Sequence, residues 1–288
     1  MNTVTVIVPY RHGTVPDRSR FPNGTVFSDD EQRGKKYALY KAVSAATTEW
    51  VWLTDDDVTF PAIPAAISLP EGADLVIPSI RMERARNTLL ERLQCAEYAA
   101  IQSLTLTSAE QGHPVMCSGA NLLVRRTAWL ESYAEVHPEI AGGDDMFLLE
   151  SFKRHGRTVI ALREEALTLT ITPVSTLSAL FRQRMRWAGK AARYTDRDIR
   201  LCGCLVLIAN LLQLVVPPIL LIKFPLEWNL IRDFERRKGK DNSPQNRQKR
   251  KDHTSLGTAL LLELVYPIYI LICLIGGLLN SLRQTTRF

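Results

Sequence analysis

The sequence predicts an α/β fold, with a mostly parallel sheet that carries helices on both faces and is followed by membrane helices. In residues 1–200, short apolar runs rich in Val, Ile and Trp alternate with longer runs of helical periodicity. This alternation favours a parallel sheet with crossover helices. Two apolar stretches, 201–222 and 256–282, come next. Because a helix that crosses the hydrocarbon core needs about 20 apolar residues, we expect a globular domain attached to a membrane.

The elements are expected in a regular order. Strand patterns cover residues 3–8, 49–54, 74–78, 121–124, 158–162 and 166–172, and helical patterns cover 35–47, 83–104 and the segments that follow Gly143 and surround Gln183. In the first helical pattern, the apolar residues recur at a spacing that places them on one face. Residues 10–33 are rich in charged residues and contain Asn23-Gly24. They predict a polar loop with one turn.

The two apolar stretches predict different kinds of membrane segment. Residues 256–282 form the cleaner candidate, whereas Pro217-Pro218 interrupts 201–222. The connecting loop, 223–255, holds ten Lys or Arg against five Asp or Glu. Short basic loops usually stay in the cytoplasm. Residues 201–222 would therefore turn back at the prolines as a re-entrant hairpin, which leaves the loop inside. Alternatively, they cross the membrane and place the loop outside. The sequence does not decide between these topologies.

Charge and cysteine content narrow the function classes. The formal net charge is +6, and the basic residues concentrate beside the apolar stretches, at 182–200 and 223–251. Such flanking charge favours contact with anionic lipids. Because no nucleic-acid-binding motif is found, we expect no nucleic-acid partner. The five cysteines are scattered and odd in number, which predicts a reducing, cytoplasmic location for the globular part.

The clearest chemical signal is the acidic end of an apolar run. Asp55, Asp56 and Asp57 directly follow the strand pattern at 49–54, and ligands of open α/β sheets bind at the carboxyl ends of strands. Adjacent carboxylates repel one another unless a cation neutralises them, and oxygen ligands suit Mg²⁺ or Mn²⁺. On an extended segment, Asp55 and Asp57 face the same way. The triplet therefore predicts a metal site or, alternatively, a solvated acidic turn.

Three further motifs follow the acidic triplet. They are Cys117-Ser118-Gly119-Ala120-Asn121, Gly142-Gly143-Asp144-Asp145 and Gln183-Arg184-Met185-Arg186-Trp187. This ordered set resembles the D-x-D, S-G-A-N, G-D-D and Q-x-x-R-W motifs of family 2 glycosyltransferases, in the membrane-bound branch related to cellulose, hyaluronan and chitin synthases. Val8-Pro9-Tyr10 and Gly34-Lys35-Lys36 are similar to the end of that family's first strand and the start of its first helix. The resemblance covers roughly residues 1–200 and implies a GT-A fold.

The resemblance also implies roles for particular residues. Asp57 would bind Mg²⁺ or Mn²⁺ directly, Asp55 would contact the ribose or the metal shell, and Asp145 would be the general base of an inverting transfer. Donor contacts are expected from Pro9, Tyr10, Arg11, Lys36 and Asp55. Contacts with the acceptor or the diphosphate are expected from Ser118, Gly119, Asn121, Asp144, Gln183, Arg186 and Trp187. The reaction needs such groups, because the leaving diphosphate gains charge and the acceptor hydroxyl loses a proton.

Alternatives remain for two of these assignments. A helix that begins near Asp144 would use that carboxylate as its N-cap and leave Asp145 as the base, although Asp144 could itself be the base. The segment that contains Gln183, Arg186 and Trp187 could instead be an amphipathic helix with arginines on anionic lipid.

Residues 10–33 depart from the family pattern. They show no second strand with a nucleotide-binding acid, and a βαβ unit needs about 30 residues or more. Asp29 or Asp30 would have to substitute for the missing nucleotide-binding acid; alternatively, both belong to a solvated face. We predict an inverting glycosyltransferase in the inner membrane, with a cytoplasmic catalytic domain, a UDP- or GDP-sugar donor and a glycan or lipid-linked acceptor. The alternative is a catalytically degenerate binding or assembly subunit, and the sequence leaves open an oligomer or a partner subunit.

Overall fold

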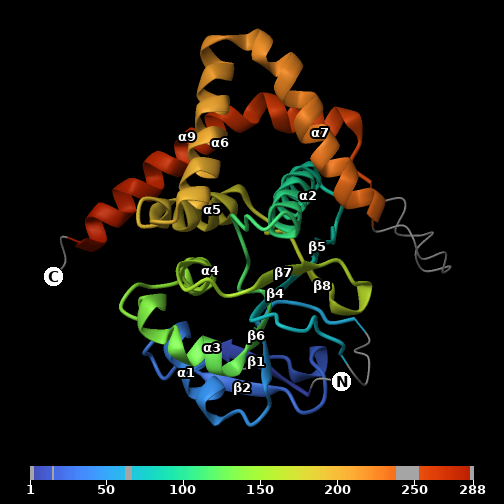
Figure 1. Cartoon of the computed structure of the whole chain (residues 1–288). Helices are drawn as coiled ribbons and strands as arrows, with labels where there is room; N and C mark the ends of the chain where they lie inside the picture. Colours follow the sequence, from blue (N-terminus) through green and yellow to red (C-terminus); the bar gives the residue numbers. More distant parts are fainter. Residues whose placement is uncertain (1–2, 15, 62–66, 238–252, 286–288) are drawn as a thin grey trace. The chain divides into compact units, whose positions relative to one another are not determined.

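The computed structural model describes residues 3–14, 16–61, 67–237 and 253–285. The chain divides into two compact units, one made of residues 1–81 and 105–171 and the other of 82–104 and 172–288. Helix α2 (Leu89–Glu110) contributes to both units. Figure 1 labels the elements of each unit.

The first unit is built on a six-stranded sheet. Its strands are β1 (Val4–Tyr10), β2 (Val26–Asp29), β3 (Trp50–Thr54), β4 (Leu75–Pro78), β6 (Asn121–Arg125) and β7 (Val159–Leu162), in the order β2-β1-β3-β6-β4-β7. Strand β6 runs antiparallel to β3 and β4, and the other pairs are parallel. This confirms the predicted mostly parallel α/β fold. A second sheet pairs β5 (Ile80–Met82) with β8 (Leu169–Ile171).

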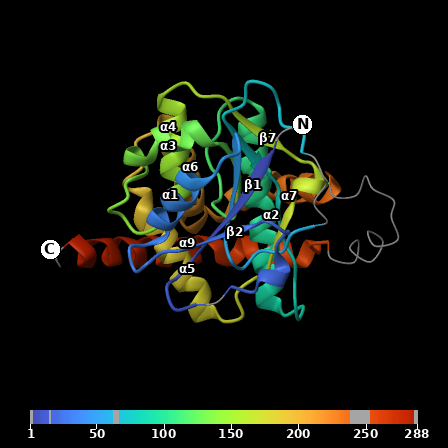
Figure 2. The same ribbon diagram turned by 90° about the horizontal axis from the view of Figure 1, so that it is seen from below.

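Burial explains why these segments are strands. All five residues of β3 are buried, as expected for a central strand whose two faces are both covered. Helix α1 (Lys35–Ala45) packs its apolar face on β1 and β2, and α3 (Arg126–Glu131) packs on β6. Helices α1 and α3 lie side by side in both views (Figure 1 and Figure 2). Helix α4 (Asp144–Arg154) follows and buries Phe147, Leu148 and Phe152.

Residues Val26–Asp29 form strand β2, which the sequence pattern did not predict. Strand β2 pairs in parallel with β1, with Ile7 opposite Val26 and Tyr10 opposite Asp29. Its connection from β1 contains one 3₁₀ turn, Arg18–Arg20, instead of a helix. The prediction of a loop alone was wrong because the strand has only four residues and one buried side chain, too short for a visible alternation.

Two other elements begin later than the sequence pattern predicted. Helix α2 starts at Leu89 because Asn87 has a left-handed φ of 56° and Thr88 Oγ1 accepts the Glu91 N–H at 3.2 Å, which caps the helix. The pattern predicted as a strand at 166–172 opens with the 3₁₀ turn Glu165–Leu167 and becomes strand β8 afterwards.

The second unit is helical. It contains part of α2 together with α5 (Leu177–Ala191), α6 (Arg197–Val215), the 3₁₀ turn Pro217–Ile219, α7 (Leu220–Arg237) and α9 (Leu256–Thr285). Helices α6 and α7 form two arms joined at the proline turn (Figure 1), so the chain reverses there. Helix α9 packs on α5, α6 and α7. Gly277 allows the α5 contact, because a Cβ built there would lie 2.7 Å from the Gly189 backbone nitrogen.

The predicted basic loop at 223–255 is helical in its first part. Helix α7 continues to Arg237. Near its start, Lys223 is buried and pairs with Glu227 at 3.1 Å and with Glu263 of α9. Residues 238–252 lie outside the described residues. Two helical segments, Arg197–Val215 and Leu256–Leu279, are long and apolar enough to cross a membrane.

Candidate active site

The acidic triplet lies at the carboxyl end of β3, as the sequence predicted. Thr54, the last strand residue, is fully buried and donates its hydroxyl to the Ala120 carbonyl at 2.9 Å. Beyond Asp55 the backbone enters a turn that contains Asp56 and Asp57, so the expected extended alternation is wrong here. The Arg20 guanidinium holds this turn by donating to the Asp57 carbonyl at 3.0 Å.

Lys35 joins the acidic strand end to the G-D-D motif. Its ammonium lies 2.7 Å from Asp55 Oδ1 and 3.0 Å from Asp144 Oδ2. Burial alone would lower the pKa of Lys35, but Asp144 and then Asp55 raise it, so the residue stays charged. Two carboxylates that are 89 residues apart in the sequence, at positions 55 and 144, thus share one cation.

Gly119 provides the close approach of the S-G-A-N loop to this cluster. A Cβ at position 119 would lie 3.1 Å from both Asp144 Oδ2 and Lys35 Nζ, and 3.7 Å from Asp145 Cβ. A larger residue here would have to displace the Asp144 and Lys35 side chains by a few tenths of an ångström. The half-buried Ser118 lies beside it, and Cys117 Sγ contacts the Asp145 carbonyl at 3.2 Å.

The two acids of the G-D-D motif are held differently from what the sequence predicted. Asp144 is not the N-cap of α4; Gly143 occupies that position, without a side-chain cap. Asp145 is the residue held by backbone N–H groups, since Oδ2 accepts from Gly119 at 2.9 Å and Oδ1 from Met146 at 2.8 Å.

The electrostatics separate these two acids. Burial raises the pKa of Asp145, and the neighbouring negative charge of Asp144 raises it further. Burial acts on Asp144 in the same direction, but the Lys35 ammonium outweighs it, so the pKa of Asp144 is lowered. When the environments of two carboxyls separate their pKa values, the more basic one suits proton abstraction. That carboxyl is Asp145.

Lys36 requires a correction, because it does not face a donor site. Its side chain is almost fully buried, and the ammonium donates to the carbonyls of Val136, His137 and Ile140 at 2.7, 2.7 and 2.8 Å. These three bonds use all three donors of an ammonium group. Lys36 therefore anchors the loop that leads to the G-D-D motif, and Lys35 is the lysine at the candidate site.

Replacing Lys36 by Met is expected to lower the free energy of unfolding by about 2 kcal/mol, because three carbonyls lose a charged donor. Thermal unfolding measures the loss. Lys41→Met is the control on the same helix, since Lys41 pairs with Glu31 at the surface and should matter little. A Lys36→Met protein of full stability that no longer bound a donor would restore the role predicted from sequence.

Asn121 also requires a correction. It is fully buried, and its amide accepts from Trp52 Nε1 at 2.7 Å and donates to the carbonyls of Ser79 and Leu167 at 2.9 Å each. Both ends of the amide are engaged within the protein. Asn121 thus supports the sheet beneath the site and does not reach an acceptor.

The nucleotide side is formed by the ends of β1 and β2. Pro9 is buried in β1, Tyr10 ends that strand, and Arg11 is exposed directly after it. Asp29 ends the neighbouring strand, where it accepts from the Glu31 N–H at 2.8 Å and contacts His12 Nδ1 at 3.0 Å. These bonds, the backbone N–H first, lower the pKa of Asp29 and keep it ionised.

The Q-x-x-R-W motif lies on α5 in the second unit. Its buried member is Arg184, which is paired with Glu97 of α2 at 2.6 Å. The Arg184 guanidinium also donates to Gln183 Oε1 at 2.8 Å and lies 4.2 Å from the centre of the Trp187 ring. Trp187 and Arg186 are exposed. Arg184 therefore positions two of the residues that were predicted to contact the acceptor or the diphosphate.

Comparison with known proteins identifies the family. A sequence model described as Glycosyltransferase like family 2 matches residues 4–190. The chain belongs to this glycosyltransferase family. Among solved structures, the mannosyltransferase PcManGT from Pyrobaculum calidifontis, in complex with GDP-Man and Mn²⁺, is similar with a TM-score of 0.51 and 16% identity over 97% of this chain and 86% of that chain. This likeness supports a GT-A fold.

A second solved structure is less similar, and no curated protein matches. The glucosyl-3-phosphoglycerate synthase from Mycobacterium tuberculosis, in complex with Mn²⁺, UDP-Glc and phosphoglyceric acid, gives a TM-score of 0.39 and 17% identity over 68% of this chain and 82% of that chain. Comparison with curated proteins gives no significant match.

The acidic triplet of this family 2 glycosyltransferase supplies carboxylate oxygens, the kind of ligand that Mg²⁺ and Mn²⁺ prefer. Among the described residues no group of three or more His, Cys, Asp or Glu side chains is arranged to hold a metal. Mg²⁺, however, commonly binds through one or two carboxylates plus substrate phosphates. Desolvation, followed by the charges of Asp55 and Asp56, raises the pKa of Asp57. A bound cation would relieve the repulsion between Asp57 and its neighbouring carboxylates.

Sequence reasoning missed two residues of this glycosyltransferase that the structure brings to light. The first is Lys35, for which Lys36 was chosen: Lys36 shares a helix face with Leu39 and Val43, and this spacing could have indicated that Lys36, and not Lys35, faces the core. The second is Glu97, the partner of Arg184, for which the sequence carries no signal. Asp29 was considered from the sequence, but its place at a strand end became clear only from the pairing of β2 with β1.

Proposed function

We propose that the protein is a membrane-attached, inverting glycosyltransferase that transfers a sugar from a UDP- or GDP-sugar to a lipid-linked or glycan acceptor. The observation that carries this proposal is the Lys35 bridge between Asp55 and Asp144, with Asp145 and Gly119 against it. It joins the acidic strand end, where a donor diphosphate would bind, to the acids that would face the acceptor. PcManGT, one of the similar structures, is in complex with GDP-Man and Mn²⁺.

Each residue would have a defined task in this transfer. Asp145 would take the proton of the acceptor hydroxyl, and the Lys35 ammonium would stabilise the negative charge that develops on the leaving diphosphate. Asp57, with Asp55, would hold Mg²⁺ or Mn²⁺, which when bound neutralises diphosphate charge. Asp29 would contact the nucleoside at the end of β2. Attack by the acceptor on the face opposite the diphosphate, in one displacement, inverts the anomeric centre.

Membrane attachment would come from the helical unit. Helix α6 and the Leu256–Leu279 segment of α9 are both long and apolar enough to cross a membrane. The chain reversal at Pro217 favours the re-entrant hairpin over a full crossing by 201–222. The basic residues of 223–255 would then remain with the catalytic domain on the cytoplasmic side of the inner membrane. We also retain the predicted relationship to the cellulose, hyaluronan and chitin synthase branch as part of this proposal.

An active enzyme is favoured over a degenerate binding subunit. The argument for degeneracy was the missing second strand, and strand β2 with Asp29 at its end removes that argument. Asp55, Asp144 and Asp145 are also gathered around Lys35 and Gly119.

The metal assignment is tested by Asp57→Asn, which keeps the shape and removes a charge. Calorimetry with UDP- and GDP-sugars, with and without Mn²⁺, should give metal-dependent donor binding that is about tenfold weaker or worse, because a charged oxygen ligand is lost. Asp56→Asn in the same turn is the matched control and should bind the donor like the wild type. Equal loss in both variants, or in neither, would contradict the assignment.

A further inference from the structure

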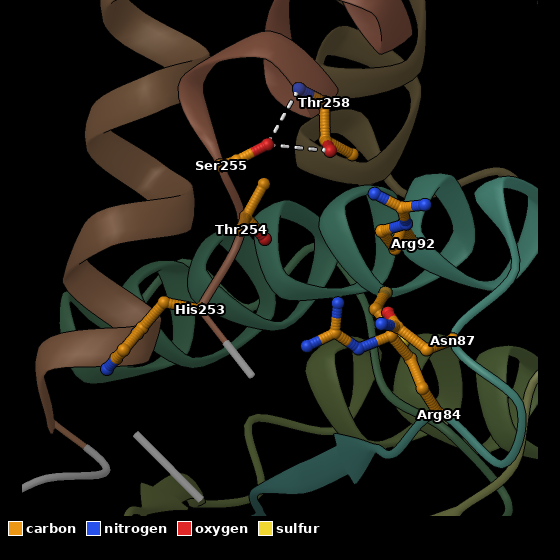
Figure 3. A pocket seen from close by; sticks show the side chains of 8 residues that line it. Arg84, Asn87, Arg92, His253, Thr254, Ser255 and Thr258 are labelled. Carbon is orange, nitrogen blue, oxygen red and sulfur yellow. Dashed lines mark hydrogen bonds between the residues drawn. The ribbon is translucent and has the colours of Figure 1, made fainter. Parts of the chain in front are cut away.

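A cavity in the second unit is lined by groups that suit an anion. It has a volume of about 220 Å³, and its polar lining includes Arg84, Asn87, Arg92, Thr254 and Ser255. Figure 3 shows the arginines on the segment around the start of α2, and Ser255 and Thr258 at the start of α9. A single water molecule needs roughly 10–15 Å³ of such space, so the cavity has room for a larger polar group.

Two donors in this cavity have no partner among the residues that the structure describes. The Arg92 guanidinium has no hydrogen bond or ion pair with any residue that the structure describes. Thr254 is nine-tenths buried, and its hydroxyl likewise has no partner in the described ranges. The first turn of α9 adds backbone N–H groups that have no intrahelical acceptor. One of them, the Thr258 N–H, donates to Ser255 Oγ at 3.1 Å.

Two acidic groups of the neighbouring elements are engaged by other donors. Glu235 of α7 accepts from the Thr254 N–H at 2.8 Å and contacts His253 Nδ1 at 3.2 Å. Glu91 of α2 is buried and accepts from the Arg86 N–H at 2.8 Å. The cavity therefore presents guanidinium, hydroxyl and helix N-terminal donors, a set that matches phosphate oxygens.

We propose that this cavity binds the phosphate group of an anionic membrane lipid. The lipid source follows from position, because the lining residues Ser255 and Thr258 lie at the start of the apolar segment Leu256–Leu279. In the proposed membrane-attached enzyme this is the depth at which lipid phosphates lie. The site would fix the start of α9 against α2. This inference rests on the proposed membrane attachment and not on the proposed chemistry.

The test uses the full chain, purified in a neutral detergent. Binding of a short-chain phosphatidylglycerol is compared with binding of a diacylglycerol of the same chains and of inorganic phosphate. We expect phosphatidylglycerol to bind more tightly than both. Arg84→Gln and Arg92→Gln should each weaken it by about tenfold or more, since a charge-assisted hydrogen bond is lost. Thr254→Val, which preserves shape, should weaken it less.

Arg193→Gln is the matched control, since Arg193 is exposed in the same unit and does not line the cavity. It should bind phosphatidylglycerol like the wild type. Equal binding of diacylglycerol and phosphatidylglycerol, or unchanged binding in both Arg84→Gln and Arg92→Gln, would overturn the proposal. Inorganic phosphate bound as tightly as the lipid would overturn the lipid assignment. Donor binding is measured on the same samples and should be unchanged in Arg92→Gln, so that failure of the proposed enzymatic function is distinguished from failure of this site.

Discussion

Asp145→Asn is expected to reduce turnover by roughly 10² to 10⁴, the usual contribution of a general base, while donor binding stays near that of the wild type. The buried carboxyl of Asp145 lies beside Asp144, and both effects raise its pKa toward the range of an effective base. The Asn side chain is nearly the same shape but cannot take the proton. Nucleotide release in the presence of acceptor measures turnover, and calorimetry measures donor binding.

The same substitution has a structural cost that must be measured separately. The Asp145 carboxylate accepts from the Gly119 and Met146 N–H groups, and an amide can accept only through its oxygen. We expect a loss of about 1 kcal/mol in the free energy of unfolding from the weakened pair of bonds. Thermal unfolding of the variant therefore accompanies the assay.

Asp144→Asn is the matched comparison for the catalytic assignment. It weakens the ion pair with Lys35 and should impair donor binding as well as turnover, because Lys35 then loses one of its two carboxylates. A fully active Asp145→Asn enzyme would remove Asp145 from the mechanism. An inactive Asp144→Asn enzyme with intact stability and donor binding would transfer the role of base to Asp144.

Glu97→Gln is expected to destabilise the protein by about 3 kcal/mol or more, because it leaves the Arg184 charge buried without its partner. Only 6% of each of these two side chains is exposed, so water cannot replace the lost carboxylate. The melting temperature should fall accordingly. Since Arg184 also contacts Gln183 and Trp187, the variant should lose acceptor use more than donor binding.

Two further variants test whether the loss of stability comes from leaving a buried charge without its partner. Glu131→Gln breaks the more exposed pair with Arg157 and should cost less than about 1 kcal/mol. Glu97→Leu combined with Arg184→Met removes both buried charges and should recover much of the lost stability, because no unpaired charge remains. If Glu97→Gln were no less stable than Glu131→Gln, the buried pair would not have the role given to it here.

Local sequence patterns were sufficient for most of the sheet. The run Trp50–Thr54 is apolar over its whole length, and the structure places it as a buried central strand. The short strand Val26–Asp29 was not predicted, because one buried residue in four gives no periodic pattern and its pairing with β1 is a tertiary contact. The start of α2 was predicted too early, since the left-handed Asn87 is visible only in the backbone.

The sequence by itself determined the fold class, the acidic strand end and the order of the motifs, because these depend on residues close together in the chain. Only the tertiary structure decided which lysine serves the site: Lys35 meets Asp55 and Asp144, while Lys36 meets carbonyls about 100 residues away. The same holds for Glu97, which pairs with Arg184 across 87 residues. The physical reason is that the partner of a buried charge or amide is selected by folding, and distant contacts of this kind leave no local pattern.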